Sequence, residues 1–412
     1  MTAPIDATAV AALAHQPIGW WHKGIPPSWS DRSAAQVCAS RPDPFDDGVL
    51  GPLCVLSETA LAHNLSAMTD WCLFRGVNLA PHAKTHMSPQ LLARQFEAGA
   101  WGATVATISQ VRTLRQFGVR RILLANELVD AAGLRWLAAE LAADPEAVVV
   151  CWVDSVAGVE SMTATLRDFG ATRPLDVCVE VGMPGGRTGC RGRDAVDEVA
   201  GAVARSRHLR LVGVAGYEAA LGHDVSPESY DRVRNYLREI RAAVLRLGPT
   251  FECDEVLATA GGSTFPDAVA EELTDWPDGS SVRTVLRSGC YLTHDDGLYR
   301  STSPLPLRAA LSVWAQVMSR PEPDLALLTM GRRDVSHDQG LPVPHGLDGS
   351  HVTALNDQHA FLSLGPSDSA RVAVGDWLRF GISHPCTTFD KWQLIPVLDD
   401  DGRVVDLIRT FF

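Results

Sequence analysis

The segment PHAKTHMSP, residues 81–89, places a lysine between two histidines. Lysine is rare in this chain, because among 36 lysines and arginines only Lys23, Lys84 and Lys391 are lysines. A guanidinium group stays protonated, whereas an ammonium group can lose its proton and act as a nucleophile or form a Schiff base. Lys84 is therefore the first candidate for chemistry, against the simpler interpretation of a surface cation.

The histidines beside Lys84 have two interpretations. If the backbone stays extended through this segment, His82, Lys84 and His86 point to the same side, and neighbouring charge disfavours the ammonium form of the lysine. Alternatively, the two histidines form a packed, hydrogen-bonded pair that shapes the end of a strand. The residues alone leave both interpretations open.

Glycines and hydroxyl groups after two apolar runs predict a phosphate site. The run EVLATAGGSTF ends in Gly262, Ser263 and Thr264, whose N–H and hydroxyl groups can surround an anion at the start of a helix. The next run leads into RSGCYL, where Gly289 and Tyr291 can complete the same cradle. A tight turn would explain either string taken alone.

Two further segments offer contacts to a ring or a charge. Arg187 lies among glycines in GMPGGRTGC, and Tyr217 follows an apolar run in VAGYEAA. Arg187 can face a cofactor ring or a carboxylate, or it can be a solvated loop arginine. Tyr217 can contact a cofactor or pack in the core.

A candidate metal site lies near the C-terminus. His384 and Cys386 stand two residues apart in GISHPCTTF, so that imidazole and thiolate project together from an extended segment. Both groups are common zinc ligands, and water or substrate would complete the coordination. His359 in NDQHAFL, with Asp357, is a further polar candidate that can also be structural.

The elements that must position these residues follow a regular pattern. Between residues 50 and 300, eight short apolar runs alternate with segments of helical periodicity; the runs start near residues 77, 101, 121, 147, 175, 209, 255 and 282. This pattern predicts an α/β fold with a (β/α)₈ TIM-type barrel, with an open doubly wound sheet as the alternative. Lys84 would then lie at the carboxyl end of a strand, where barrel active sites form.

After residue 302 the pattern changes to strands without long helices, ending in a hairpin around Asp401 and Gly402. The sequence therefore predicts three segments. Residues 1–45 are an N-terminal extension that drapes over the core, residues 46–302 are the barrel, and residues 303–412 are an all-β domain that carries the metal site.

Composition excludes several partners. The net charge of −13 is spread along the chain without basic clusters, which argues against nucleic acid and anionic membranes as partners. No leader and no long apolar segment is visible, so we expect a cytoplasmic protein. Nine cysteines without a CxxC pair indicate neither a disulfide framework nor a four-thiolate zinc site.

The motifs PHAKTH, VGMPGGRTG, GYE, AGGSTF, SGCY and HPC, in this order, resemble those of the D-serine dehydratase and D-threonine aldolase family. These are fold-type III pyridoxal phosphate enzymes with an alanine-racemase-like barrel. The resemblance spans roughly residues 50–395, and the N-terminal extension is similar to a branch of amino acid deaminases. It implies pyridoxal 5′-phosphate in the barrel, Zn²⁺ in the β domain and a homodimer.

The resemblance also implies roles for single residues. Lys84 matches the Schiff-base lysine, and His384 and Cys386 match the zinc ligands of the dehydratases, whereas the aldolase branch has an aspartate in the second position. His359 matches a histidine near the metal with a catalytic role, but Gln358 stands where a glutamate is usual. The residues assigned to cofactor binding, besides Lys84, are His82, Arg187, Tyr217, Gly262, Ser263, Thr264, Gly289 and Tyr291.

The activity implied by the resemblance is a zinc-assisted β-elimination. A β-hydroxy D-amino acid such as D-serine or D-threonine would lose water, with Lys84 as the base, and hydrolysis of the resulting aminoacrylate would give a 2-oxo acid and ammonia. A metal-dependent D-threonine-type aldolase is the alternative that uses the same parts. A non-catalytic pyridoxal phosphate-binding protein is the alternative of another class.

Overall fold

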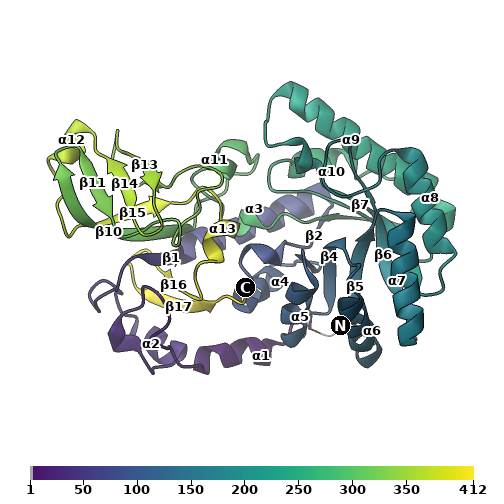
Figure 1. The fold of residues 1–412 in the computed structure, drawn as a ribbon, viewed down its shortest axis with the longest axis horizontal. Coiled ribbons are helices and arrows are strands. Elements are labelled where there is room, and N and C mark those ends of the chain that lie inside the picture. Colours follow the sequence, from purple (N-terminus) through teal and green to yellow (C-terminus); the bar gives the residue numbers. More distant parts are fainter. Residues whose placement is uncertain (1–2) are drawn as a thin grey trace. The chain divides into compact units, whose positions relative to one another are not determined.

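The computed structural model describes residues 3–412, which divide into two compact units (Figure 1). The first, here called the barrel unit, comprises the N-terminal residues up to Asp6, Thr69–Lys84 and Gln95–Gly289. The second, here called the β unit, comprises Ala7–Met68, Thr85–Arg94 and Cys290–Phe412. Each unit is therefore built from segments that are distant in the sequence.

Eight parallel strands form the sheet of the barrel unit, in the order β2-β9-β8-β7-β6-β5-β4-β3. They are β2 (Asn78–Leu79), β3 (Ala103–Val105), β4 (Arg121–Glu127), β5 (Val148–Val153), β6 (Leu175–Val181), β7 (Leu209–Gly216), β8 (Val256–Ala260) and β9 (Val282–Leu286). Each of the eight apolar runs singled out in the sequence contains one of them. The predicted α/β barrel-type fold is confirmed.

Backbone hydrogen bonds also join β2 and β3, the two strands at the opposite edges of this order. The N–H of Trp101 donates to the carbonyl of Leu79 at 2.7 Å, and the N–H of Thr104 donates to the carbonyl of Pro81 at 2.9 Å. His82 forms a parallel bridge with Thr104. Because the other strands pair consecutively, these bonds close the sheet on itself.

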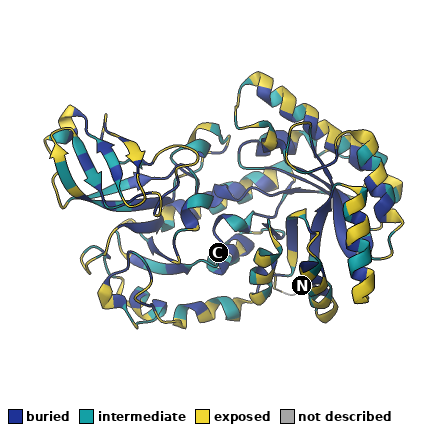
Figure 2. Cartoon of the chain, in the orientation of Figure 1, coloured by how far each residue is buried: buried dark blue, intermediate teal, exposed yellow. Residues whose placement is uncertain are grey.

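Helices follow the strands, and their outer faces are exposed, as the yellow residues in Figure 2 show. They are α5 (Ile108–Gln116), α6 (Ala131–Ala143), α7 (Val156–Phe169), α8 (Arg193–Ala204), α9 (Pro227–Arg246) and α10 (Pro266–Glu272). Side-chain oxygens of Thr107, Asp130, Ser155 and Ser226 accept N–H bonds in the first turns of α5, α6, α7 and α9. These caps satisfy N–H groups that have no partner within the helix.

The inside of the barrel is apolar, with a cluster that includes Leu123, Trp152, Val212 and Val285. At Gly213 the strands β7 and β8 approach so closely that an added Cβ would lie 2.2 Å from the carbonyl oxygen of Leu257. A glycine is therefore required at this position of the sheet.

The β unit contains a nine-stranded sheet. Its strands are β1 (Leu53–Ser57), β10 (Leu311–Glu322), β11 (Leu325–Leu328), β12 (Val343–Pro344), β13 (His351–Leu355), β14 (Ala360–Ser363), β15 (Trp377–Gly381), β16 (Leu394–Leu398) and β17 (Val404–Arg409). The predicted C-terminal hairpin is β16–β17, with antiparallel pairing from Leu394 and Arg409 onward. The prediction of a mostly stranded C-terminal part is confirmed.

The N-terminal residues pack with this second sheet. Strand β1 pairs with β10 in antiparallel and with β16 in parallel orientation. The residues before it include the helices α1 (Ala7–Ala12) and α2 (Ala34–Ser40), and Trp29 and Val37 share a core with Leu53, Leu394 and Leu407. Residues 7–68 thus belong to the β unit, whereas the sequence pattern places residue 46 onward in the barrel.

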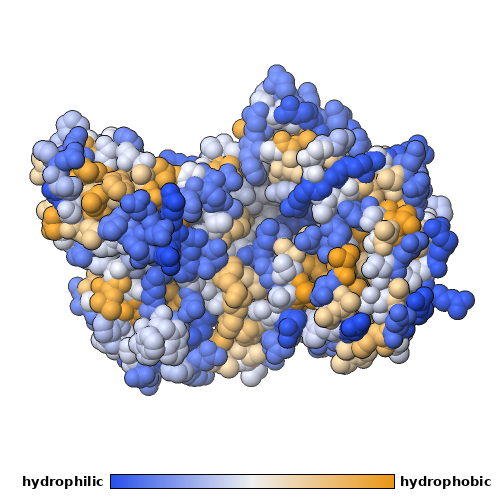
Figure 3. All heavy atoms as spheres, in the orientation of Figure 1, coloured by the Kyte–Doolittle hydropathy of each residue, from blue (hydrophilic) through white to orange (hydrophobic). Residues whose placement is uncertain are grey.

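Two helices contain residues of both units, α3 (Glu58–Arg75) and α4 (Pro89–Glu97). Three short helices, α11 (Leu298–Thr302), α12 (Pro366–Ser369) and α13 (Cys386–Phe389), belong to the β unit. Within residues 3–412, no helix has the length and apolar character needed to cross a membrane. On the face drawn in Figure 3, hydrophobic atoms occur in separate patches among hydrophilic ones.

The Thr104 hydroxyl provides a test of the barrel closure. It donates to the carbonyl oxygen of Ala80 at 2.7 Å, and both groups are buried. Thr104→Val keeps the shape but leaves this oxygen without a partner, so we expect the free energy of unfolding to fall by about 1–3 kcal/mol in urea denaturation. The control Thr353→Val removes an exposed bond to the carbonyl of Phe361 and should have a smaller effect. Equal losses in the two variants would contradict this account.

Candidate functional site

Lys84 lies in a short 3₁₀ turn, Ala83–Thr85, that follows β2. The extended geometry needed for His82, Lys84 and His86 to point to one side is therefore not maintained through the segment. The condition for the first interpretation of the two histidines is not met, because the chain turns directly after the bridge between His82 and Thr104.

The three lysines differ in their partners. Lys23 forms an ion pair with Asp334 at 2.9 Å, and Lys391 forms one with Asp390 at 3.1 Å. No carboxylate forms an ion pair with Lys84 among residues 3–412. Because no described carboxylate occupies its amine, Lys84 is the lysine best placed for covalent chemistry.

His82 is half-buried and lies close to positive charges. Burial lowers the pKa of His82 well below its usual value, and Lys84, Arg287 and Arg187 act in the same direction. Its Nδ1 atom is buried and has no hydrogen-bond partner within the described part of the chain. A neutral imidazole with an unsatisfied buried nitrogen is suited to contact a ligand.

His86 has a different environment, in the β unit. Its Nδ1 accepts a hydrogen bond from the N–H of Ser88 at 3.0 Å, and its ring lies 6.2 Å from that of Phe389. The side chain is almost fully buried. For His86, these contacts favour the interpretation of a packed histidine that shapes the turn before α4.

The glycines of the predicted phosphate cradle bind a carboxylate. The N–H groups of Gly261 and Gly262 donate to the two carboxylate oxygens of Glu218, at 2.9 and 2.7 Å. Glu218 is completely buried, and it follows Tyr217 in the GYE motif. Burial raises the pKa of Glu218, whereas the two N–H groups and Arg287 oppose this effect. The glycine turn is therefore an anion nest, as expected, but Glu218 occupies these two donors.

The other cradle residues lie at neighbouring strand ends. Ser263 and Thr264 follow β8, and Thr264 Oγ1 is hydrogen-bonded to Nδ1 of His223 at 2.8 Å. Gly289 follows β9, and the preceding Ser288 donates its hydroxyl to the carbonyl of Gly262 at 2.7 Å. This bond links the two loops. Tyr291 lies in a 3₁₀ turn, Cys290–Leu292, of the β unit.

The structure brings Arg187 and Tyr217, two of the residues assigned to cofactor binding, into contact. The Cζ atom of Arg187 lies 4.5 Å from the centroid of the Tyr217 ring. Both residues line one pocket of the barrel unit, together with Glu180 and Tyr236. Tyr236 accepts a hydrogen bond from the N–H of Tyr217 at 2.9 Å and donates its hydroxyl to the carbonyl of Val181 at 2.6 Å. The loops after β6 and β7 are thus fixed to each other.

Arg287 is a buried charge that was not singled out from the sequence. Its guanidinium donates to Thr259 Oγ1 at 2.7 Å and to the carbonyl of Gly216 at 2.6 Å. Burial lowers the pKa of Arg287, and the carboxylates of Glu218 and Glu180 oppose this effect. An arginine directly after the apolar run VRTVL, just before the cradle residues, was the available signal.

Three carboxyl groups stand at the ends of adjacent strands. Glu127 ends β4, Asp154 follows β5 and Glu180 lies near the end of β6. Burial raises the pKa of Glu127 to about 8, and the charges of Glu180 and Asp154 contribute in the same direction. One oxygen of Glu180 and both oxygens of Glu127 have no hydrogen-bond partner among the described residues. This side of the barrel end is therefore strongly acidic and poorly satisfied.

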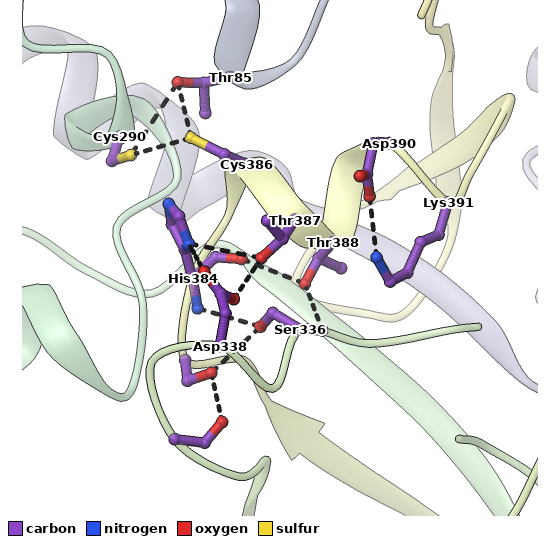
Figure 4. A network of polar contacts seen from close by, with 12 residues as sticks. Thr85, Cys290, Ser336, Asp338, His384, Cys386, Thr387, Thr388, Asp390 and Lys391 are labelled. Carbon is purple, nitrogen blue, oxygen red and sulfur yellow. Dashed lines mark hydrogen bonds and ion pairs between the residues drawn. The ribbon is translucent and has the colours of Figure 1, made fainter. Parts of the chain in front are cut away.

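The predicted metal ligands form a cluster in the β unit, drawn in Figure 4. The ligand atoms of Cys290, His384 and Cys386 all lie within 4.8 Å of one another. The two sulfur atoms are 3.6 Å apart. Sequence reasoning had found His384 and Cys386 but not Cys290, although its motif SGCY had been noted for the neighbouring glycine and tyrosine.

Several contacts orient this cluster. Nδ1 of His384 lies 2.6 Å from an oxygen of Asp338, and the hydroxyl of Thr387 donates to the other oxygen at 2.6 Å. The Thr85 hydroxyl lies 3.3 Å from the sulfur of Cys386 and 3.9 Å from that of Cys290. Asp338 and Thr85 were also not found from the sequence, because they are distant from the H-x-C motif along the chain.

The electrostatics of the cluster favour a thiolate. The hydrogen bond from Cys290 and the neighbouring His384 lower the pKa of the Cys386 thiol well below its usual value. Burial opposes this effect. Burial lowers the pKa of His384, but Cys386 and Asp338 outweigh this and raise it to about 9. A thiolate and an imidazole held in this way are suitable ligands for a divalent metal.

A buried carboxyl group, Asp295, lies five residues after Cys290 in the sequence. One of its oxygens accepts bonds from the N–H groups of Gly297 and Tyr299, both at 2.9 Å, and the other has no partner within residues 3–412. Burial raises the pKa of Asp295 to about 7, and the charge of His384 opposes this. Asp295 is thus a candidate acid or base that sequence reasoning missed.

His359 is not brought into this network. It lies in the loop between β13 and β14, where its carbonyl accepts the N–H of Asn356 at 2.8 Å. Within residues 3–412, no hydrogen bond or ion pair links its side chain to the metal cluster. Asp357 is exposed, 3.6 Å from Arg333. A catalytic role for His359 stays a prediction.

The acidic group at the barrel end gives a prediction for the pH dependence of stability. The folded state keeps a proton on Glu127 up to about pH 8, whereas the unfolded chain releases it near the ordinary value of 4.5. The free energy of unfolding should therefore fall as the pH rises through this interval. Glu127→Gln removes the titrating group, so the variant should lose at least about 1 kcal/mol less than the parent protein between pH 5 and pH 8, allowing for partial exposure.

Thermal or urea unfolding at several pH values measures this difference. Glu198→Gln, on the exposed side of α8, is the matched control because it removes the same charge. If the free energy of unfolding depends on pH in the same way in Glu127→Gln, Glu198→Gln and the parent protein, Glu127 does not control the pH dependence of stability.

Comparisons with known proteins agree with this arrangement. The family model described as "Alanine racemase, N-terminal domain" matches residues 56–275, and the model described as "Putative serine dehydratase domain" matches residues 310–398. D-threonine aldolase from Arthrobacter sp. is 29% identical over 360 residues, covering 86% of this chain and 90% of that protein.

Two further relatives cover most of the chain. D-threo-3-hydroxyaspartate dehydratase from Delftia sp. (strain HT23) is 26% identical over 383 residues, covering 86% of this chain and 95% of that protein. The crystal structure of D-threonine aldolase from Filomicrobium marinum matches with a TM-score of 0.77 at 27% identity, covering 88% of this chain and 95% of that chain. With an alanine racemase N-terminal domain over half of its length and a serine dehydratase-like domain after it, the chain belongs to the D-serine dehydratase and D-threonine aldolase family.

Proposed function

We propose that this protein is a pyridoxal phosphate-dependent, zinc-assisted enzyme that eliminates water from a β-hydroxy D-amino acid; hydrolysis of the resulting enamine takes up one water molecule and yields a 2-oxo acid and ammonia. One observation carries the proposal. Within residues 3–412, Lys84 has no carboxylate partner, and the same chain holds a Cys–His cluster that could bind a metal; its relatives include a dehydratase and aldolases of such amino acids. The relatives support the general assignment of the protein as an enzyme that acts on D-amino acids.

The residues of the barrel unit fit the cofactor. His82 offers an unsatisfied buried nitrogen, and Arg187 and Tyr217 lie together beside a pocket. Ser263 and Thr264 offer hydroxyl groups next to the glycine nest. Pyridoxal phosphate, when bound, supplies a conjugated ring that withdraws electrons from the α-carbon of an amino acid.

Lys84 has two tasks in this proposal. Its amine would hold the cofactor, and as a free amine it would take the proton from the α-carbon of the substrate. The neutral His82 beside it does not compete for that proton, because its pKa lies well below the usual range owing to burial and the neighbouring cations.

The metal cluster would act on the leaving group. Hydroxide leaves poorly, and a zinc ion held by this cluster would supply Lewis-acid stabilisation of the negative charge on the β-oxygen. His384 and Cys386 are suited to hold zinc, because thiolate ligands favour zinc over magnesium. Asp338 would fix the orientation of His384 through its hydrogen bond to Nδ1.

The aldolase alternative uses the same parts. D-threonine aldolase from Arthrobacter sp. has a higher identity to this chain than the Delftia dehydratase, 29% against 26%. Cleavage between the α- and β-carbons needs a base for the proton of the β-hydroxyl group. Asp295, whose pKa burial raises to about 7, is a group of suitable basicity.

Product analysis with D-threonine distinguishes these reactions. Elimination predicts 2-oxobutanoate and ammonia, whereas aldol cleavage predicts glycine and acetaldehyde. Incubation of D-serine, D-threonine and 3-hydroxy-D-aspartate, with and without a chelator, should give the 2-oxo acid and ammonia only when metal is present. Cys386→Ala should lower kcat by at least about 100-fold, since it removes Lewis-acid assistance. Glycine as the main product would favour the aldolase, and turnover unaffected by Cys386→Ala and by chelation would exclude a metal-assisted step.

A lysine pair serves as the control for the cofactor. In protein loaded with pyridoxal phosphate, Lys84→Ala should abolish the visible absorption band that the cofactor shows when it is bound to the lysine. Lys391→Ala, which removes a lysine that pairs with Asp390, should leave this band unchanged. A non-catalytic carrier of the cofactor would show the same band but no turnover of any β-hydroxy D-amino acid. Absence of the band in the loaded parent protein would contradict the proposal.

Glu218 gives a further prediction for the cofactor site. Glu218→Ala leaves the N–H groups of Gly261 and Gly262 without their acceptor and removes one of the two carboxylates whose charge acts on Arg287. We expect pyridoxal phosphate to bind at least about tenfold more weakly, in equilibrium titrations followed by absorbance, because the loops after β7 and β8 lose their common anchor. Glu218→Gln keeps one acceptor oxygen, so its affinity for pyridoxal phosphate should lie between those of the parent protein and Glu218→Ala. Unchanged affinity in Glu218→Ala would show that the nest does not support the cofactor site.

A further inference from the structure

The metal cluster contains one more sulfur than the H-x-C motif provides. Cys290 lies 94 positions before His384 in the sequence, yet its sulfur is 3.6 Å from that of Cys386. Cys290 is buried in a 3₁₀ turn, Cys290–Leu292, and His384 and Cys386 are partly buried. No other group of three or more metal-binding side chains occurs within residues 3–412.

The spacing suits a tetrahedral ion. Zinc–sulfur bonds of about 2.3 Å at tetrahedral angles place two sulfur ligands about 3.8 Å apart. The observed 3.6 Å between Cys290 and Cys386 is close to this value without any movement of the chain. The nitrogen of His384 completes a triangle whose edges do not exceed 4.8 Å.

The surroundings prepare all three ligands. Nδ1 of His384 is held by Asp338, which leaves the other ring nitrogen on the side of the two sulfurs (Figure 4). The Thr85 hydroxyl contacts both sulfurs and can donate to a thiolate. A carboxylate behind a histidine and a hydroxyl beside a thiolate are typical supports of zinc ligands.

We propose that Cys290 is the third protein ligand of the metal, so that one imidazole and two thiolates hold the ion. The inference deepens the proposed function, on which it rests for the role of the metal. Three protein ligands leave the fourth tetrahedral position for a water molecule or the β-oxygen of the substrate, as in catalytic zinc sites. The two thiolates also balance the charge of a divalent ion inside a buried site.

The second thiolate has a consequence for metal choice. Sulfur ligands favour zinc and cobalt over magnesium and manganese, which prefer oxygen. This site should therefore bind Zn²⁺ and Co²⁺ tightly and should bind Mg²⁺ or Mn²⁺ weakly. A site made only of His384 and Cys386 would have a smaller preference.

The test uses the full-length protein loaded with pyridoxal phosphate. Cys290→Ser should lower the affinity for Zn²⁺ at least about 100-fold in competition with a chromophoric chelator, because a direct ligand is lost. In the Co²⁺-loaded protein, the thiolate-to-metal absorption should fall to about half, since one of two thiolates remains. Cys38→Ser is the matched control, because Cys38 is a partly buried thiol of the same unit outside the cluster. It should leave both measurements unchanged.

A measurement on the unmutated protein covers the case in which the variant does not fold. Alkylation followed by mass spectrometry should show that bound Zn²⁺ protects Cys290 and Cys386 to the same extent and leaves the labelling of Cys38 unchanged. If Cys290→Ser folds and keeps the zinc affinity and the full cobalt absorption, or if zinc protects Cys386 but not Cys290, the proposal is wrong.

Failure of this inference differs from failure of the proposed function. Intact metal binding in Cys290→Ser, together with turnover of β-hydroxy D-amino acids by the parent protein, overturns the third ligand alone. Loss of metal binding in Cys290→Ser, with no turnover by the parent protein, supports the third ligand and overturns the function.

Discussion

The burial of Glu218 against two glycine N–H groups is the interaction on which the end of the barrel depends. A carboxylate inside a protein is costly unless hydrogen bonds and an opposite charge compensate it. Gly261 and Gly262 provide the hydrogen bonds, and Arg287 provides the charge while it also binds the carbonyl of Gly216. The hydrogen bonds of Glu218 and Arg287 therefore connect the strand ends and loops after β7, β8 and β9, which carry most of the candidate cofactor residues.

In the β unit, sulfur-containing side chains form a second group of polar residues that contact one another. Its cluster joins Thr85, Cys290 and the segment around Cys386, which are far apart in the sequence. A thiolate, an imidazole and a carboxylate lie in contact there, and each shifts the proton affinity of the next. Such a group of mutually stabilised charges is suited to accept a metal ion, which would replace the protons that the groups now share.

The two sets of residues meet in the sequence at two points. Lys84 is followed directly by Thr85, and Gly289 is followed directly by Cys290. The segments that carry candidate cofactor residues thus continue into segments that carry candidate metal residues. A replacement at either junction is expected to affect both groups, which makes distant controls such as Cys38 and Lys391 necessary for any mutational study.

Local patterns in the sequence determined the eight barrel strands, the C-terminal hairpin, the rare Lys84 and the H-x-C pair, because strand periodicity and motif spacing act over a few residues. Only the tertiary structure decided which distant groups meet. It placed β1 in the C-terminal sheet, Glu218 in the glycine nest, Arg287 against Thr259 and Gly216, and Cys290 beside Cys386. It also turned the chain at Ala83–Thr85, where the extended pattern had placed three side chains on one face. These contacts depend on long-range packing and on compensation of buried charge, and neither leaves a periodic signal in the sequence.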